Sequence, residues 1–466
     1  MVQLNRSMME RYEIADRRPQ TLRAAIFGAD RMMLGVAARL LDRANEQGGD
    51  AGAVCITRAA EALRAQDCMF TMLVRGDNED GSHTSEERVV QSILAAVNPE
   101  NEFSVMLEYA EKPALELMFL PAACDGIKLA LAARFLYARW EKGLEAPAVL
   151  LAGEHPRYGE ADEIRSAMTA LARGWNEGEA FAAWLQQASF CALLAESMCG
   201  ALSEAEQAKA QHDMNYRDDF IAWAEPQLKC TPGGDVPEFL IPVCNKGDFA
   251  AACTRKARVF DAVVFLCVSV GYLCGMDSFA QVLKDEKLRD WIGHAFFDEI
   301  LPDLPYAREE IAPDVIAAFA RLENSMNDMP LLENGRGLLS TFPSAVLPAI
   351  ISWADREFEA PRRLSLALSA AIMLYAGARR NAAGAYEVAR GNQSVVISDD
   401  PDILDAFSCL AHDMPAESLA YAALADRAIW GRDLREIDGL EMRVSFDLSS
   451  IQRIGLRETM RIQNEE

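Results

Sequence analysis

The spacing of apolar residues changes near residue 245, and this change limits the possible fold more than any other feature of the sequence. Before it, short apolar runs alternate with amphipathic segments, as strands alternate with helices. The predicted strands are 22–28, 53–57, 69–74, 103–107, 115–120 and 148–151, and the predicted helices are 32–44, 127–140 and 160–172. This alternation is typical of a mostly parallel sheet that helices cover on both faces.

The strand signal fades after residue 175. Segments 180–199 and 204–213 have helical spacing, and a stretch marked by proline and glycine follows at 231–242. Beyond residue 245, long periodic segments predict helices at 256–273, 278–299, 307–320, 344–353 and 362–376. We therefore expect an α/β domain over 1–245 and a nearly all-helical domain over 246–466.

The charge balance limits the possible partners. The chain carries 71 Asp and Glu against 46 Lys and Arg, a net charge of −25, so its average field repels nucleic acid and anionic lipid surfaces. The N-terminus is polar, and the longest apolar run is interrupted by Asp261 and Ser269. We expect no export signal, no membrane span, and reduced thiols in the cytoplasm for the eleven cysteines, which form no C-x-x-C pair.

Several kinds of catalytic motif are missing from the sequence. The five histidines, at 83, 155, 212, 294 and 412, are dispersed without metal-ligand spacing, so we expect no metal site. There is no G-x-S-x-G elbow and no Walker loop, which argues against a serine hydrolase and a P-loop enzyme.

A series of short motifs runs in order through the second half: TRKARV at 254–259, GYLCGM at 271–276, DWI at 290–292, FDEILP at 297–302, DDP at 399–401 and AIWGRDL at 428–434. Their order and spacing resemble the tagaturonate reductases (altronate oxidoreductases) of the mannitol dehydrogenase family. The resemblance implies a Rossmann-like, NAD-binding domain at 1–245 and a mannitol dehydrogenase C-terminal-type domain at 246–466. It also implies a sugar acid or polyol as substrate, a role in hexuronate metabolism, and a monomer or weak oligomer.

The resemblance places catalytic residues on the helix that follows Thr254. The family has a lysine general base there, an asparagine five residues later and a histidine three residues further, and the last two polarise a carbonyl. Lys256 matches the first, whereas Asp261 and Val264 replace the others. We expect Lys256 to open a helix beside the interdomain cleft, either as a general base or as the ion-pair partner of Asp261.

Other polar positions of the family are also changed. A family asparagine corresponds to Ala192 and a family lysine to Thr341, and two turns of the cofactor domain, at 121–124 and 156–158, keep none of the family residues. His155, with Arg157 beside it, is the candidate for a substitute donor, because it follows the predicted strand 148–151 at the sheet edge where ligands bind.

The segment 26–35 takes the place of the Gly-x-Gly turn through which such folds approach a diphosphate. Gly28 remains from the two close glycines, and Asp30 and Arg31 follow it as candidate cofactor-binding residues. A carboxylate at Asp30 would obstruct and repel a phosphate at the start of a helix. Its alternative role is that of a plain N-cap.

Two functions remain open from the sequence. The first is an NAD-dependent oxidoreductase of the tagaturonate reductase type, acting on a sugar acid or polyol with altered catalytic positions. The second is a non-catalytic relative that serves as a binding or regulatory protein on the same fold. The changes at Asp261 and Val264 predict little or no reduction of tagaturonate or fructuronate.

Overall fold

The computed structural model describes residues 2–9, 11–77, 83–122, 124, 126–153, 155–156, 159–324, 329–390 and 393–465. The chain divides into two compact units, Met1–Cys253 and Thr254–Glu466. The division lies inside helix α8 (Phe249–Lys256), whereas the boundary predicted near residue 245 stands just before that helix.

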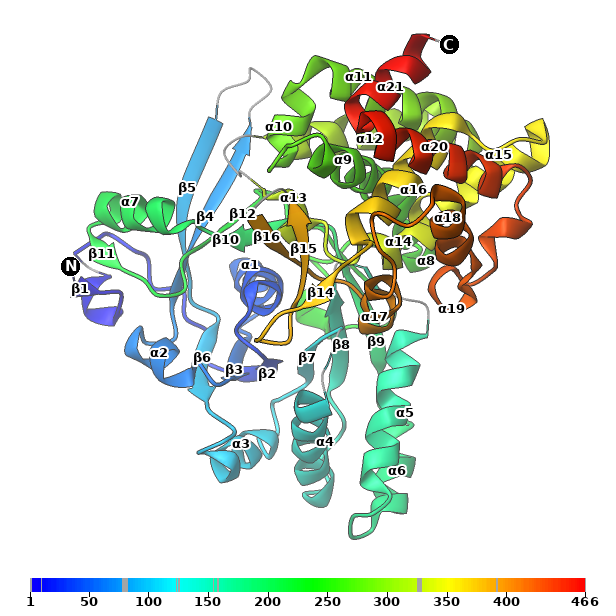
Figure 1. The fold of residues 1–466 in the computed structure, drawn as a ribbon. Coiled ribbons are helices and arrows are strands. Elements are labelled where there is room, and N and C mark those ends of the chain that lie inside the picture. The colour runs from blue at the N-terminus through cyan, green and yellow to red at the C-terminus, as the bar shows by residue number, and fades with distance from the viewer. Residues whose placement is uncertain are drawn as a thin grey trace. The chain divides into compact units, whose positions relative to one another are not determined.

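The first unit is built on a seven-stranded sheet of order β13-β9-β8-β7-β2-β3-β6 (Figure 1). Its strands are β2 (Leu22–Phe27), β3 (Gly52–Ile56), β6 (Ile93–Val97), β7 (Leu117–Pro121), β8 (Ala148–Gly153), β9 (Phe190–Ala195) and β13 (Cys230–Pro232). All neighbours pair in parallel except β13 with β9. The six parallel strands follow the Rossmann order, with the switch point between β2 and β7. The predicted mostly parallel, Rossmann-like sheet is confirmed.

The sheet is apolar on both faces because alternate residues of each strand point to opposite sides. In β2, Ala24 and Ile26 pack into one core, and Ala25 and Phe27 pack into another. The first core also holds residues of the π-helical turn η2 (Met33–Ala38), α1 (Arg39–Glu46) and α2 (Ala60–Ala65). The second holds residues of α3 (Phe103–Ala110), α4 (Gly126–Glu141), α5 (Glu160–Ala172) and α6 (Gly178–Leu185).

Two smaller sheets accompany the central one. The first has the order β10-β12-β4-β5, from β4 (Phe70–Asp77), β5 (His83–Val90), β10 (Cys199–Ala201) and β12 (Ala222–Ala224). The second pairs β1 (Val2–Gln3) with β11 (Tyr216–Arg217), and helix α7 (Glu204–Met214) precedes β11. The predicted strand 69–74 is therefore real but lies outside the central sheet.

Two predictions for the first unit are wrong. The segment 103–107 belongs to helix α3 and not to a strand, because Met106 and Ala110, four residues apart, are the pair it buries. The segment 180–199 is helical only as far as Leu185, and Phe190–Ala195 forms the central strand β9. A continuous apolar run can be a buried strand or a buried helix, and its spacing alone does not distinguish them.

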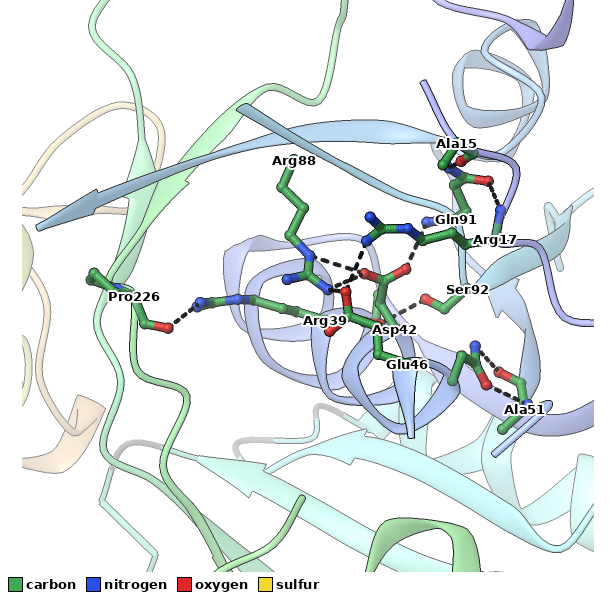
Figure 2. Close-up of polar contacts among 12 residues, drawn as sticks. Ala15, Arg17, Arg39, Asp42, Glu46, Ala51, Arg88, Gln91, Ser92 and Pro226 are labelled. Carbon is green, nitrogen blue, oxygen red and sulfur yellow. Dashed lines mark hydrogen bonds and ion pairs between the residues drawn. The ribbon is translucent and has the colours of Figure 1, made fainter. Parts of the chain in front are cut away.

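A polar network around the buried Asp42 holds helix α1 against the N-terminal segment and β5 (Figure 2). The Asp42 carboxylate accepts hydrogen bonds from Arg88 at 3.0 and 3.1 Å and from the backbone N–H of Gln91 at 3.3 Å. Glu46 lies 2.5 Å from the Arg88 guanidinium and 2.8 Å from that of Arg17. Burial raises the pKa of Asp42, and Arg88 opposes that rise. The helix is thereby fixed by charges from two other segments.

Arg39 joins helix α1 to the loop that follows β12. It is 2% exposed, and its Nη2 donates to the carbonyl oxygens of Glu225 at 2.7 Å and Pro226 at 3.0 Å (Figure 2). Burial and the neighbouring arginines lower the pKa of Arg39 to about 10.

The second unit is helical, as predicted. A continuous helical run spans 249–273 and comprises α8, a π-helical turn η4 (Ala257–Asp261) and α9 (Ala262–Leu273). We call this run the spine helix. The other elements are α10 (Phe279–Lys284), α11 (Glu286–His294), η5 (Ala295–Ile300), η6 (Leu301–Asp303), α12 (Arg308–Glu323), α13 (Leu331–Asn334), α14 (Leu338–Ala345), α15 (Leu347–Glu357), α16 (Arg362–Tyr375), α17 (Pro401–Ser408), α18 (Ala416–Ala425), α19 (Arg427–Trp430), η7 (Leu434–Glu436), α20 (Leu440–Ile454) and α21 (Leu456–Glu465).

This unit also contains a small antiparallel sheet that the sequence analysis missed. It consists of β14 (Arg379–Arg380), β15 (Tyr386–Arg390) and β16 (Gln393–Ile397). Within the described ranges, no single helix is long and apolar enough to cross a membrane, and only the bent pair α14 and α15 passes that test jointly.

Two acids, Glu299 and Asp447, are buried in the second unit, and Glu299 lies where α16 begins. Glu299 is 3% exposed and accepts hydrogen bonds from the backbone N–H groups of Arg363 at 3.0 Å and Leu364 at 2.8 Å. Asp447 on α20 is fully buried, and Arg443 donates to it at 3.4 Å. Burial raises the pKa of Asp447 to about 7, with Glu299 adding to the rise and Arg443 opposing it.

We predict that Asp447→Asn makes the protein more stable relative to wild type as the pH rises. The folded-state pKa of Asp447, about 7, lies above its ordinary value of 3.8, so its stabilising contribution is present below pH 4 and is lost as the pH passes 7. One pKa unit corresponds to about 1.4 kcal/mol, so the change is on the order of 2–4 kcal/mol. Urea unfolding of both proteins at pH 5 and pH 8 measures it. A difference in unfolding free energy that is the same at both pH values would contradict the prediction.

Candidate active site

The turn after β2 lies at the switch point of the sheet, where α/β folds bind their ligands. Gly28 has a φ of +120°, a conformation that favours glycine. Its N–H donates to the Ile56 carbonyl at 3.0 Å, and its carbonyl accepts from the Cys55 thiol at 3.2 Å. The shape of the turn therefore favours glycine at position 28.

Asp30 caps the helix that follows this turn. Its Oδ1 accepts hydrogen bonds from the backbone N–H groups of Met32 at 3.0 Å and Met33 at 3.1 Å. Its Oδ2 lies 3.1 Å from the place that a Cβ on Gly28 would take. Asp30 is therefore an N-cap in the structure, which is the alternative role that the sequence left open.

A dinucleotide does not fit the turn in this conformation. The amides at a helix N-terminus are the donors that bind a diphosphate in Rossmann-like folds, and here the Asp30 carboxylate already occupies two of them. Arg31, the next residue, begins the helix, and its carbonyl accepts from the Cys199 thiol at 3.3 Å.

The other predicted positions of the first unit lie on or just after the neighbouring strands β8 and β9. His155 is exposed and lies just beyond the carboxyl end of β8, whereas Ala192 is buried within β9. Arg157, the predicted neighbour of His155, lies outside the described residues, as do 123, 125 and 158. The role of His155 as a donor stays a prediction.

Arg58 is a candidate that the sequence analysis missed. It follows β3 (Gly52–Ile56) by two residues, at the strand end where Rossmann folds place an acid for the ribose or an arginine for a 2′-phosphate. Its side chain is 72% exposed and lies 2.7 Å from Glu100. The sequence contained the signal for Arg58. An acid soon after the second strand indicates a contact to the ribose, whereas an arginine there indicates a contact to a 2′-phosphate.

The expectation that Lys256 opens a helix is wrong. The spine helix begins earlier, at Phe249, because the Asp248 carboxylate accepts from the N–H groups of Ala250 at 2.9 Å and Ala251 at 3.2 Å. Lys256 is the last residue of α8 and directly precedes the π-helical turn η4. Its place beside a cleft between the domains stays a prediction.

The π-helical turn brings Lys256 and Asp261 together. Residues five apart lie about 140° apart around an α-helix, whereas the i to i+5 pattern of a π-helix places them on one side. Lys256 Nζ lies 2.6 Å from Asp261 Oδ1, and the two side chains are 7% and 8% exposed. The ion pair that the sequence left open is therefore present in the structure.

The arrangement has one proton donor and one acceptor. The ammonium of Lys256 can only donate hydrogen bonds, and the carboxylate of Asp261 can only accept them. Val264 lies one turn beyond Asp261 on α9 and can do neither. Thr341 lies on α14, which packs against η4 and α9, and its hydroxyl donates to the carbonyl of Leu338 at 3.1 Å.

The neighbouring basic residues bind different acids. Arg255 contacts Asp314 and lies 3.3 Å from Glu310, and Arg258 lies 2.6 Å from Asp303. The three cations at 255, 256 and 258 therefore do not converge on one point. Among the described residues, no three His, Cys, Asp or Glu side chains are placed to hold a metal ion.

Comparisons with known proteins give one consistent set of relatives. No family model matches the chain. The altronate oxidoreductases of Shigella flexneri and of Escherichia coli O139:H28 are each 24% identical to it over 458 residues, which covers 90% of this chain and 92% of theirs.

Solved structures agree on the fold. The mannitol 2-dehydrogenase of Pseudomonas fluorescens, in a ternary complex with NAD and D-mannitol, superposes with a TM-score of 0.77 at 16% identity over 100% of both chains. A substrate-free D-sorbitol dehydrogenase superposes with a TM-score of 0.71 at 15% identity, over 99% of this chain and 100% of its own.

We predict that Asp261→Leu destabilises the protein by about 3 kcal/mol, because it leaves the buried Lys256 ammonium without this carboxylate. The double variant Lys256→Met with Asp261→Leu removes both charges and should cost far less. Urea unfolding of the wild type, both single variants and the double variant gives the coupling energy of the pair. Additive effects of the two single changes would show that the ion pair does not contribute.

Proposed function

Because the chain belongs to the mannitol dehydrogenase family, we propose that it is an NAD-dependent oxidoreductase of slow turnover that acts on a sugar acid or a polyol. Lys256 is the observation that carries the proposal. It stands at the position of the family's general base and is buried beside a π-helical turn, a feature that often marks functional sites. The relationship to altronate oxidoreductases over most of the chain supports the substrate class.

In this proposal Lys256 exchanges a proton with the reacting oxygen, and Asp261 positions Lys256. When a ketone is reduced, the Lys256 ammonium donates a proton to the oxygen that becomes a hydroxyl. In the oxidation direction the proton passes back to the lysine, and Asp261, 2.6 Å away, holds the ammonium in place. Lys256 is therefore the catalytic acid and base, and Asp261 orients it.

The same geometry supports the proposal that turnover is slow. The family places two hydrogen-bond donors where the oxygen gains negative charge, and this chain has a carboxylate and a methyl-bearing side chain at Asp261 and Val264. A carboxylate near a developing alkoxide repels it, and valine offers no hydrogen bond. The chemistry then depends on Lys256 alone among these three positions.

A non-catalytic relative is the second candidate function. Two observations favour it: the Asp30 carboxylate occupies the amides that a diphosphate needs, and Asp261 engages Lys256 in an ion pair. Such a protein would bind a small sugar acid or polyol without converting it. The two candidates differ in whether turnover exists and whether it depends on Lys256.

We predict that the purified protein reduces tagaturonate and fructuronate with NADH at least 100-fold more slowly than an ordinary enzyme, which turns over about 10 times per second. The loss of absorbance of NADH measures the rate. Asp261→Asn together with Val264→His should raise the rate, because the pair restores an amide and an imidazole as polarising groups.

Lys256→Met decides between the candidates, with Lys246→Met at an exposed loop position as the matched control. A slow rate that the first variant abolishes and the second leaves intact supports an enzyme. No turnover in any protein, together with retained binding of the sugar acid, supports the non-catalytic relative. Turnover at ordinary rates in the wild type would show that the site has been misinterpreted.

A further inference from the structure

We propose that the Asp30 carboxylate is an internal competitor for the dinucleotide's diphosphate, so that cofactor binds only when this side chain leaves the helix N-terminus. The inference rests on the proposed function, because it assumes that the turn after β2 is the cofactor site. It goes beyond that function by assigning Asp30 the control of cofactor affinity.

The first observation is that Asp30 holds the donors of the site. Its Oδ1 accepts from the N–H groups of both Met32 and Met33, at 3.0 and 3.1 Å. These are first-turn amides of the helix that follows the first strand of the parallel sheet, and their partial positive charge attracts anions. A phosphate oxygen and a carboxylate oxygen cannot occupy the same two hydrogen bonds, and their like charges repel.

The second observation is that Asp30 also fills the space above Gly28. A glycine is kept in such turns so that a ligand can approach the backbone closely. Here the Oδ2 of Asp30 lies 3.1 Å from the point where a Cβ on Gly28 would stand. The Asp30 carboxylate therefore occupies the space that glycine leaves open at position 28.

The third observation is that the backbone of the turn is already fixed. Gly28 is held through its N–H by Ile56 and through its carbonyl by the Cys55 thiol. The carbonyl of Arg31 is held by the Cys199 thiol, and Gly35 packs so tightly on Cys199 that a Cβ there would lie 2.5 Å from the sulfur.

The obstacle is therefore a side chain and not the fold. Asp30 is exposed, so rotation about its side-chain bonds carries the carboxylate into solvent without moving the helix. The network around Asp42 and Arg88 keeps that helix in place meanwhile (Figure 2). Removing the carboxylate should expose an intact anion site.

Titrations with inorganic pyrophosphate and with NADH test the proposal, with thermal shift and calorimetry as readouts. The proteins are the wild type, Asp30→Gly, Asp30→Asn and the matched control Asp400→Gly, which removes an exposed aspartate cap from α17 in the second unit. We expect Asp30→Gly to bind both probes at least tenfold more tightly than the wild type. Asn caps a helix as well as Asp does, so Asp30→Asn keeps the fold and should show an intermediate gain from loss of charge alone.

Three results would overturn the proposal: equal affinity of the wild type and Asp30→Gly for both probes, no binding by any of the proteins, or an equal gain in Asp400→Gly. Tight NADH binding that is the same with and without Asp30 would overturn it while leaving the proposed function intact. A gain for pyrophosphate without any binding of NADH would support the role of Asp30 at an anion site and remove the NAD-dependent function. If Asp30→Gly fails to fold, Asp30→Asn carries the same comparison.

Discussion

The amides that begin a helix have no partner inside it, and both units of this protein depend on carboxylates to supply one. Asp248 begins the spine helix that carries Lys256, and Glu299 binds the first amides of α16 from another element. Asp30 does the same after β2. The excess of acid over base is thus partly used within the fold. In so acidic a chain, an anionic ligand that approaches a helix end competes with the protein's own side chains.

In the spine helix, one π-helical turn determines whether Lys256 and Asp261 contact each other. Without the π-helical turn, Lys256 and Asp261 would point away from each other around the helix. With it, the two charges neutralise each other at 2.6 Å. An acid at position 261 is therefore accommodated by the fold.

The sequence predicted the parallel sheet and the helical second unit, because long buried segments carry strong periodicity. It failed at Phe190–Ala195, where an apolar run has no period, and at α3, where a local alternation concealed a helix. It missed β15, although Tyr386 and Val388 alternate as buried residues there. At the site it identified the ion pair and the cap only as alternatives. The ion pair depends on the π-helical turn η4, and the cap depends on the direction of the Asp30 carboxylate. The spacing of residues in the sequence predicts neither feature.

Gly28 keeps its left-handed backbone although the space above it is filled by Asp30. The turn therefore has the backbone conformation that allows close approach, while Asp30 occupies the space above it. In the genetic code, aspartate and glycine codons differ by a single base, so the step between an obstructed and an open turn is among the smallest that mutation can make. By contrast, no single base change converts a valine codon into a histidine codon, so a histidine at position 264 is at least two base changes away.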